Sequence, residues 1–124
     1  MKNLKKENER LVNEDIVIRY RFIDENTGDV IVDPTDFALR FYIKGRRKAP
    51  DNSFNEVVCS KHGDAYPVNC EIDTNGYIYC FLPKNTFYPG RLILETLNAF
   101  PHAGFEDGDW EVIERGDTVV NYIR

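Results

Sequence analysis

Cysteine and histidine provide the chain's best candidate for a metal site. Cys59 and His62 form a Cys-x-x-His unit, and Cys70 and Cys80 are available as third and fourth ligands. Structural zinc requires four nitrogen or sulfur donors that converge on the ion, and these usually occur as two closely spaced pairs. Here the second pair is spread over two expected strands, where cysteines that face a core behave as small apolar residues. We therefore predict no metal ligands and no cofactor, and keep zinc at these residues as the alternative.

A second candidate is the acidic run Glu106-Asp107-Gly108-Asp109, in which carboxylates next to a glycine could bind calcium. Calcium requires about six to eight oxygen ligands, and the further spaced acidic residues of an EF-hand loop are missing. We interpret the run as a polar turn, because aspartate and glycine both favour turn backbone conformations.

Catalytic chemistry has little support in the sequence. His62 and His102 both lie in expected loops, outside any recognisable nucleophile or metal motif. Cys59 and His62 could form a thiolate pair, but such a pair needs a third group to orient the histidine, and none is evident. A glycine-rich phosphate loop is also missing. We predict a protein without catalytic residues, with a small enzyme based on Cys59 and His62 as the minor alternative.

Length and charge restrict the class of protein. The chain has 124 residues, enough for one domain with a single core, and its 42% apolar and 30% charged residues are typical of a folded protein. Acidic residues outnumber basic ones 21 to 16, and the net charge of -5 argues against nucleic acid as a partner. The local exception is the basic cluster Lys44, Arg46, Arg47 and Lys48, which could contact an acidic partner or simply be solvated.

The sequence carries no signal that predicts export or membrane insertion. Residues 1–15 are too polar for a signal peptide, and no run approaches the roughly 20 apolar residues of a spanning helix. We expect the protein to be made in a reducing cytoplasm, where its 3 cysteines stay thiols. An odd number of cysteines also excludes a complete set of internal disulfides.

Apolar residues alternate with a period of two along most of the chain, and this pattern predicts strands. The clearest strand is 37–44, where Phe37, Leu39, Phe41 and Ile43 alternate with more polar residues. We predict further strands at 16–22, 29–32, 54–59, 68–73, 77–82, 91–100, 110–115 and 118–123, with a tight turn at Gly116-Asp117 and a helical or tight turn within 83–90. About seven to nine short strands separated by turns indicate an all-β fold, an antiparallel β-sandwich, with a closed barrel as the alternative.

One hairpin can be given a register from sequence alone. A three-residue loop at Thr74-Asn75-Gly76 pairs Ile72 with Ile78, Cys70 with Cys80 and Val68 with Leu82, which matches apolar residues across one face. A two-residue loop would pair the same face with Tyr79 and Phe81, which are also apolar. Upstream of the expected domain at 15–124, residues 1–14 form a charged N-terminal arm. Residues 2–13 suit at most a weak helix with Leu4 and Leu11 on one side, which is marginal unless the arm docks on a partner.

Aromatic residues make up 13% of the chain, more than one small core commonly needs. A single core of this size cannot hold all of six aromatic side chains, namely Tyr42, Tyr66, Tyr77, Tyr79, Tyr88 and Trp110. Tyrosine is enriched where protein surfaces meet, so we predict an interface that includes Tyr42, Tyr79 and Tyr88 together with the basic cluster at 44–48. The alternative is that aromatic residues simply favour strands, and exposed tyrosines also suit stacking against sugars.

Two parts of the sequence resemble a known group of proteins. The segments Ile16-Val17-Ile18-Arg19-Tyr20-Arg21-Phe22 and Asp36-Phe37-Ala38-Leu39-Arg40-Phe41-Tyr42 resemble the opening strands of small immunoglobulin-like sandwich proteins in tailed-phage virions. The second half is similar to proteins of crAss-like and related Bacteroides phages, in the segments Asn75-Gly76-Tyr77-Ile78, Phe81-Leu82-Pro83, Tyr88-Pro89-Gly90-Arg91-Leu92 and Phe105-Glu106-Asp107-Gly108. The shared features are turn residues and strand alternation over about residues 15–124.

This resemblance implies an immunoglobulin-like sandwich that serves as a virion part, such as a neck or tail ring, collar, baseplate or fibre-attachment protein. Members of the group have no active site or cofactor, so the resemblance transfers no functional residues. It also implies a location in the virion after assembly in the host cytoplasm, other virion proteins as partners, and several copies of the chain in the particle. A carbohydrate-binding or adhesion module is the alternative, because its aromatic side chains would line one exposed face.

Overall fold

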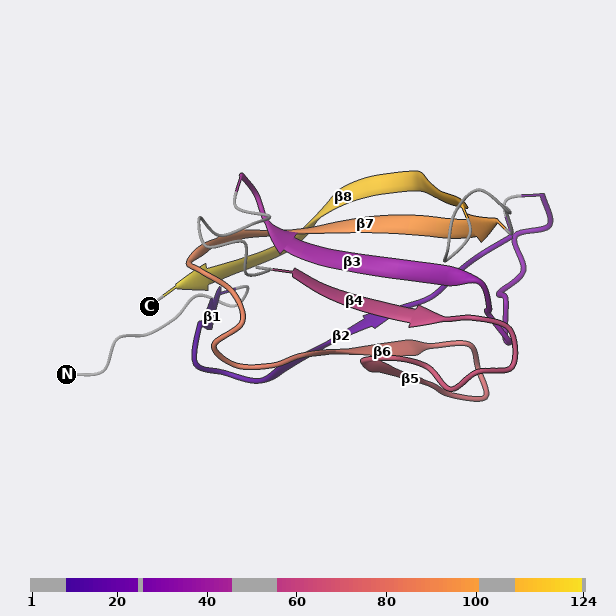
Figure 1. Cartoon of the computed structure of the whole chain (residues 1–124), viewed down its shortest axis with the longest axis horizontal. Helices are drawn as coiled ribbons and strands as arrows, with labels where there is room; N and C mark the ends of the chain where they lie inside the picture. Colours follow the sequence, from indigo (N-terminus) through magenta and orange to yellow (C-terminus); the bar gives the residue numbers. More distant parts are fainter. Residues whose placement is uncertain (1–8, 25, 46–55, 101–108, 124) are drawn as a thin grey trace.

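Two β-sheets lie face to face in the computed structural model, which describes residues 9–24, 26–45, 56–100 and 109–123 (Figure 1). The five-stranded sheet has the order β1-β8-β7-β3-β4, and the three-stranded sheet has the order β2-β6-β5. The strands are β1 (Glu9–Leu11), β2 (Ile16–Tyr20), β3 (Phe37–Ile43), β4 (Glu56–Lys61), β5 (Cys70–Ile72), β6 (Ile78–Leu82), β7 (Gly90–Phe100) and β8 (Asp109–Ile123). The described residues contain no helix, so the predicted all-β class is confirmed.

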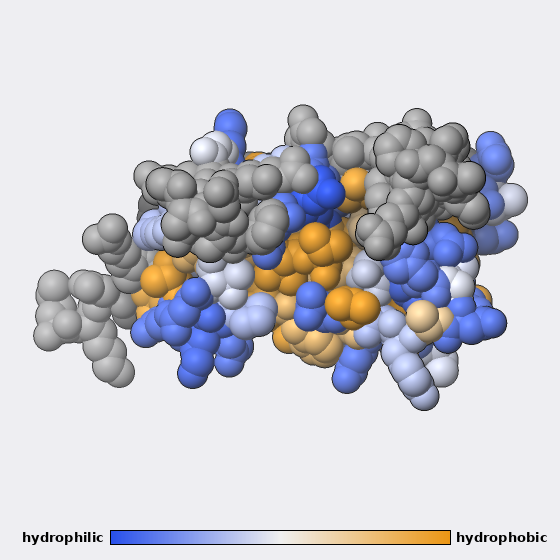
Figure 2. Space-filling view, viewed as in Figure 1, coloured by the Kyte–Doolittle hydropathy of each residue, from blue (hydrophilic) through white to orange (hydrophobic). Residues whose placement is uncertain are grey.

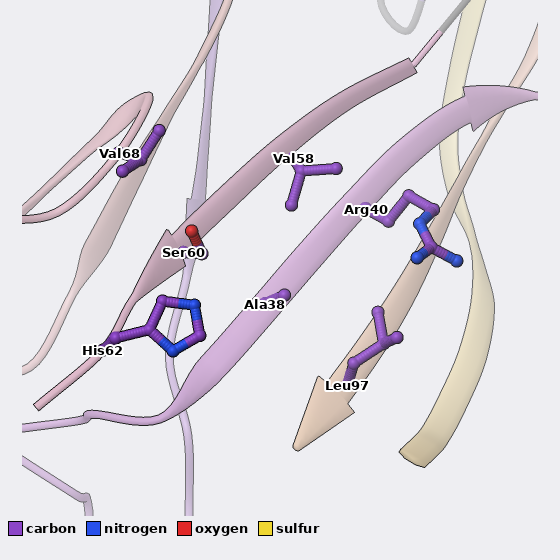
Figure 3. A pocket seen from close by; sticks show the side chains of 7 residues that line it. All are labelled: Ala38, Arg40, Val58, Ser60, His62, Val68 and Leu97. Carbon is purple, nitrogen blue, oxygen red and sulfur yellow. The ribbon is translucent and has the colours of Figure 1, made fainter. Parts of the chain in front are cut away.

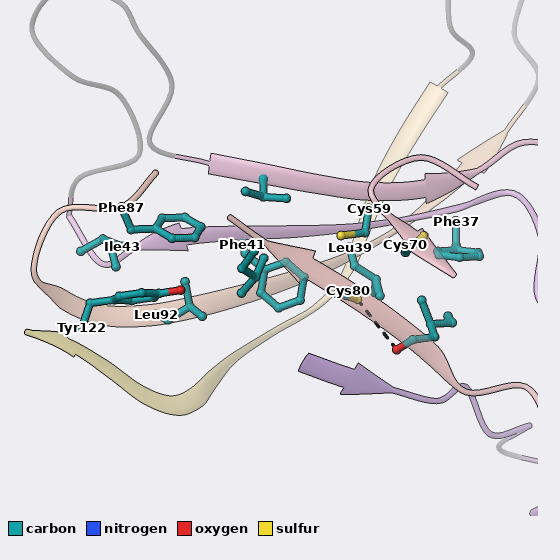
Figure 4. Close-up of a cluster of buried hydrophobic side chains, with 13 residues drawn as sticks. Phe37, Leu39, Phe41, Ile43, Cys59, Cys70, Cys80, Phe87, Leu92 and Tyr122 are labelled. Atoms are coloured by element: carbon teal, nitrogen blue, oxygen red, sulfur yellow. Dashed lines mark hydrogen bonds between the residues drawn. The ribbon is translucent and has the colours of Figure 1, made fainter. Parts of the chain in front are cut away.

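The core lies between the sheets and follows the alternation of the sequence. On β3 the side chains of Phe37, Leu39, Phe41 and Ile43 are all buried, as the period-two pattern predicts (Figure 4). The facing sheet contributes buried side chains from β6, namely Ile78, Cys80 and Leu82. Each large apolar side chain buried in this way stabilises the fold by about 1.5–3 kcal/mol.

The hairpin of β5 and β6 has the predicted register. Ile72 pairs with Ile78 and Cys70 with Cys80, but the pairing of Val68 with Leu82 is wrong. Val68 instead forms a bridge with Ser60 and joins the three-stranded sheet to β4 at one edge. The turn is fixed by the Asp73 carboxylate, which accepts hydrogen bonds from the backbone N–H groups of Asn75 and Tyr77 at 2.8 and 3.0 Å.

The last strand differs most from the prediction. We expected Gly116-Asp117 to turn the chain between two short strands, but β8 continues through both residues. Its partner β7 explains this, because Leu94 pairs with Gly116 and Ile93 with Asp117 in one long antiparallel ladder. The ladder between β7 and β8 is interrupted by two register shifts, one between Arg91 and Ile93 and one between Thr96 and Leu97, which are typical of β-bulges.

Two smaller expectations also change, and the turn expected within residues 83–90 is confirmed. Residues 9–11 of the N-terminal arm form no helix but pair in parallel with the end of β8, where their backbone groups complete the sheet edge. The expected return strand at 29–32 is reduced to a single bridge between Ile23 and Val30. The segment before β7 forms turns that place Phe87 in the core, 5.2 Å from the ring of Tyr122.

Candidate functional site

The residues predicted to form one interface lie on different parts of the molecule. Tyr42 is half-buried on the outer side of β3, whereas Tyr79 is half-buried on the outer side of the opposite sheet. Tyr88 is exposed between β6 and β7, and Lys44 is exposed just after β3. Arg46, Arg47 and Lys48 lie outside the described residues. Tyr42 and Tyr79 are therefore on opposite faces, and the described members of the set do not form one surface.

The structure instead assembles a different surface, the outer side of the three-stranded sheet. Its side chains alternate with those that fill the core, so they point away from it. We call it the Arg–Tyr face, and it consists of Val17, Arg19, Arg21, Glu71, Asp73, Tyr77, Tyr79 and Phe81. The aromatic residues Tyr77, Tyr79 and Phe81 lie on or just before the central strand β6. The arginines lie on or just after β2, and the acidic residues lie on or just after β5.

Arginine and tyrosine side chains hold one another in place on this face. The guanidinium carbons of Arg19 and Arg21 lie 4.6 and 4.2 Å from the centre of the Tyr77 ring. Arg21 also donates hydrogen bonds to the Tyr77 hydroxyl at 3.0 Å and to the Asn75 carbonyl at 3.1 Å. Cation–π contacts at exposed sites are each worth about 0.5–1 kcal/mol. The arginines are thus partly ordered before any partner binds.

An acidic residue fixes the other side of the same surface. The Tyr79 hydroxyl donates a hydrogen bond to the Asp73 carboxylate at 3.1 Å. Desolvation by itself would raise the pKa of Asp73, but the N–H groups of Asn75 and Tyr77, the Tyr79 hydroxyl and the charge of Arg21 together lower it. Asp73 therefore stays ionised at neutral pH, next to the aromatic row.

Apolar side chains complete one end of the Arg–Tyr face. Val17 and Phe81 lie opposite each other on β2 and β6, with 56% and 37% of their surfaces exposed. Their cross-strand contact is of the apolar kind that stabilises a sheet face. The face therefore combines arginine and tyrosine, two of the residue types enriched among the residues that dominate protein-binding energy, with carboxylates and exposed apolar side chains.

A groove lies on the other side of the molecule, over β3, β4 and β7. It has a volume of about 390 Å³, with His62 and Ser60 at one end and Arg40 and Leu97 at the other (Figure 3). Val58 contributes an apolar side chain, and hydrophobic surface is visible over β4 in Figure 2. The groove was not predicted, because its lining comes from strands whose neighbours are set only by the tertiary fold.

Arg40, which lines the groove, pairs with two carboxylates that lie beside it. Arg40 Nη1 lies 3.2 Å from Glu95 Oε1, and Arg40 Nε lies 3.8 Å from Glu56 Oε2. Glu95 is only 1% exposed although it sits on the outer side of β7. A buried carboxylate requires such pairing, so the main role of Arg40 is to compensate the charge of Glu95.

The four residues of the zinc alternative do not come together as a Cys-x-x-His site. Cys59, Cys70 and Cys80 are all buried between the sheets, whereas His62 is exposed and lines the groove (Figures 3 and 4). Within the described parts of the chain, no cluster of three or more histidine, cysteine or acidic residues is arranged to hold a metal ion. His102 and the acidic residues 106–108 lie outside those parts, and Asp109 begins β8.

The thiols of Cys59 and Cys70 are buried and have raised pKa values, whereas a reactive cysteine is exposed and has a lowered pKa. Hydrogen bonding to the Cys59 thiol, and then burial, raise the pKa of Cys70. For Cys59 the interaction with Cys70 acts in the lowering direction, but the interaction with Cys80 and burial outweigh it and raise the pKa. Cys59 Sγ also donates a hydrogen bond to the Asn69 carbonyl at 3.2 Å. A reactive thiolate would require a lowered pKa and exposure, so the geometry does not support Cys59 as a nucleophile.

Comparison of the chain with protein-family models, with curated proteins and with solved structures finds no match in any of the three. Among the residues that the structure describes, no helix has the length and the apolar character needed to cross a bilayer.

Proposed function

We propose that the protein is a non-catalytic assembly module of a tailed-phage virion, part of a neck or tail ring, collar or baseplate, that docks on other virion proteins. The observation that carries the proposal is the Arg–Tyr face, an exposed sheet surface whose arginine and tyrosine side chains are held in place by their own contacts. The virion setting is supported by the sequence resemblance described above, with which two facing sheets are compatible.

The chemistry of this face favours a protein partner. Arginine and tyrosine dominate the binding energy of protein interfaces, because they combine large contact area with directed hydrogen bonds. Side chains that are already ordered lose less conformational entropy on binding than free ones, which strengthens the contact. The net charge of -5 argues against nucleic acid, so the arginines are better matched to carboxylates of another protein.

Mass spectrometry of particles tests the virion setting directly. Particles purified on a density gradient from a culture that produces them should contain peptides of this chain in a fixed ratio to the major capsid protein. The matched control is the same gradient fraction from an uninduced culture, which should lack them. Particles that are complete in other structural proteins but devoid of this chain would overturn the proposal.

A carbohydrate-binding module is the second candidate, and the aromatic row of β6 favours it. Tyr79 and Phe81 of β6, and Tyr77 just before it, lie on one side of the sheet, as a platform for stacking sugars would require. The Tyr77 ring is already stacked by arginines, so Tyr79 and Phe81 would carry the binding. A glycan array probed with the wild-type protein and with Tyr79→Ala decides this point: signals that vanish in the variant support the module, and a blank wild-type array removes it.

A further inference from the structure

We propose that two copies of the chain pair through their Arg–Tyr faces, with a two-fold axis that runs along β6. The inference rests on the proposed function, because it names the partner of the same surface. Its basis is the order of charges across the three-stranded sheet, which makes the face complementary to itself.

The charges form columns that follow the strands. Arg19 and Arg21 lie on and just after β2 at one edge of the sheet, and Glu71 and Asp73 lie on and just after β5 at the other edge. The strand β6 lies between the two columns, and the guanidinium groups of Arg19 and Arg21 reach inward from their edge as far as the Tyr77 ring. When two such faces meet around an axis parallel to β6, the edges exchange sides, so that arginines lie over carboxylates and aromatic rings over aromatic rings. An axis perpendicular to the strands would place arginine over arginine, and repulsion excludes it.

The residues also match along the strand direction. Arg19 and Glu71 both pair with Tyr79, so they occupy one row of the sheet. The next row contains Arg21, which contacts Tyr77, and Asp73, whose backbone N–H donates to the Tyr77 carbonyl. Rotation about an axis parallel to β6 leaves the position of each residue along the strand direction unchanged. In backbone position, Arg19 therefore lies over Glu71 of the second copy, and Arg21 lies over Asp73 of the second copy.

Symmetry makes every one of these contacts occur twice. The arginines and carboxylates of the face balance, so pairing buries no net charge. At one end, the exposed side chain of Phe81 lies over Phe81 of the second copy and gains apolar contact, because Phe81 is on the central strand and more than a third exposed in the single chain. Two sheets stacked in this way follow the aligned packing that is common between β-sheets.

The size of the face predicts a weak interaction. With strands of 5 residues at β2 and β6, a rise of about 3.3 Å per residue and a strand spacing of about 4.8 Å, the footprint is roughly 17 by 14 Å. This footprint of about 240 Å² per copy is well below the roughly 800 Å² per partner of a standard interface, so we expect a weak, transient contact with a dissociation constant of about 10 µM to 1 mM for the isolated protein. In an assembled particle, other contacts between copies raise the local concentration and strengthen the pairing.

Charge reversal with mixing tests the proposal. Sedimentation equilibrium from about 10 µM to about 1 mM should show the wild-type chain of 14.4 kDa in exchange with its dimer. Arg19→Glu alone and Glu71→Arg alone should each lower the association constant at least about tenfold, since two attractive contacts become repulsive. An equal mixture of the two variants should regain dimer, because the glutamate introduced into one copy then faces the arginine introduced into the other.

Matched controls separate this effect from general changes in charge or folding. Lys84→Glu reverses an exposed charge outside the Arg–Tyr face and should leave the association constant unchanged. The double variant R19E/E71R restores both contacts within a single species and should dimerise like the wild type. Circular dichroism and thermal unfolding establish that each variant is folded before its association constant is measured by sedimentation.

The outcomes are distinct. A wild-type chain that stays monomeric at about 1 mM overturns the inference, as does a dimer that Arg19→Glu leaves intact or a mixture that fails to recover. None of these results touches the virion proposal, which depends on the presence of the chain in purified particles. Conversely, a dimer that behaves as expected from a chain missing from such particles would retain the pairing and remove the proposed function.

Discussion

Replacing Gly76 by alanine tests the contact between the β5–β6 turn and the segment at Ile31 and Val32. Gly76 has a φ of +84°, and a Cβ added there would collide with the backbone oxygen of Ile31 and lie 2.9 Å from the Cα of Val32. Both obstacles are backbone atoms, which cannot rotate away as the end of a flexible side chain can. Gly76→Ala therefore carries two separate costs, one from the left-handed backbone and one from the collision.

Gly28 supplies the matched control for the backbone cost. Its φ of +75° is similar, but a Cβ at Gly28 would meet nothing within 4 Å. Gly28→Ala should lower the free energy of unfolding by about 1–2 kcal/mol, the cost of a left-handed conformation for a residue with a side chain. Gly76→Ala adds about 1–3 kcal/mol for overpacking, which gives a total of about 2–5 kcal/mol.

Urea unfolding followed by circular dichroism measures the difference. With a slope of about 1–3 kcal/mol per molar, the extra cost places the midpoint of Gly76→Ala roughly 1 M below that of Gly28→Ala. Gly45→Ala, at a φ of +76° with open space around it, should match Gly28→Ala. Equal midpoints for the variants at Gly76 and Gly28 would refute the reasoning, because the turn would then not pack against the distant segment.

Other predictions concern buried polar groups. Arg40→Met should lower the free energy of unfolding by about 3 kcal/mol, because Glu95 keeps its burial but loses the guanidinium 3.2 Å away; a loss below about 1 kcal/mol in urea unfolding would contradict this. The Tyr122 hydroxyl is buried and makes no hydrogen bond among the described residues, so Tyr122→Phe should be neutral or stabilising in the same assay. Burial raises the pKa of Tyr122 from 10.0 to about 12, so the unfolded chain loses its proton first and stability falls as the pH rises through this range. Tyr122→Phe should flatten that part of the pH profile, and an unchanged slope would count against the burial. Cys59 and Cys70 should react with a thiol reagent only after unfolding, and rapid labelling of the native protein at neutral pH would show that the core is open.

Several features could be predicted because they depend on residues close together in the chain. Alternation on β3 and β2 decides which side chains face the core, since successive side chains of a strand point to opposite sides. The register of the β5–β6 hairpin follows from its turn and from the match of Cys70 with Cys80 and Ile72 with Ile78. The outward position of Arg19 and Arg21 is part of the same alternation, but their tyrosine partner is not, because it comes from a strand distant in sequence.

The all-β class, the inner and outer sides of the best strands and one hairpin follow from the residues alone, since these features depend on local period and turn chemistry. The path of β8 through Gly116 and Asp117 depends instead on the folded molecule, because the ladder to β7 outweighs the local preference of glycine for a turn. The order β2-β6-β5, which sets arginines, tyrosines and carboxylates side by side, was likewise decided by pairing between distant segments. Such pairing depends on how the whole chain buries its apolar surface, and no short stretch of residues encodes it.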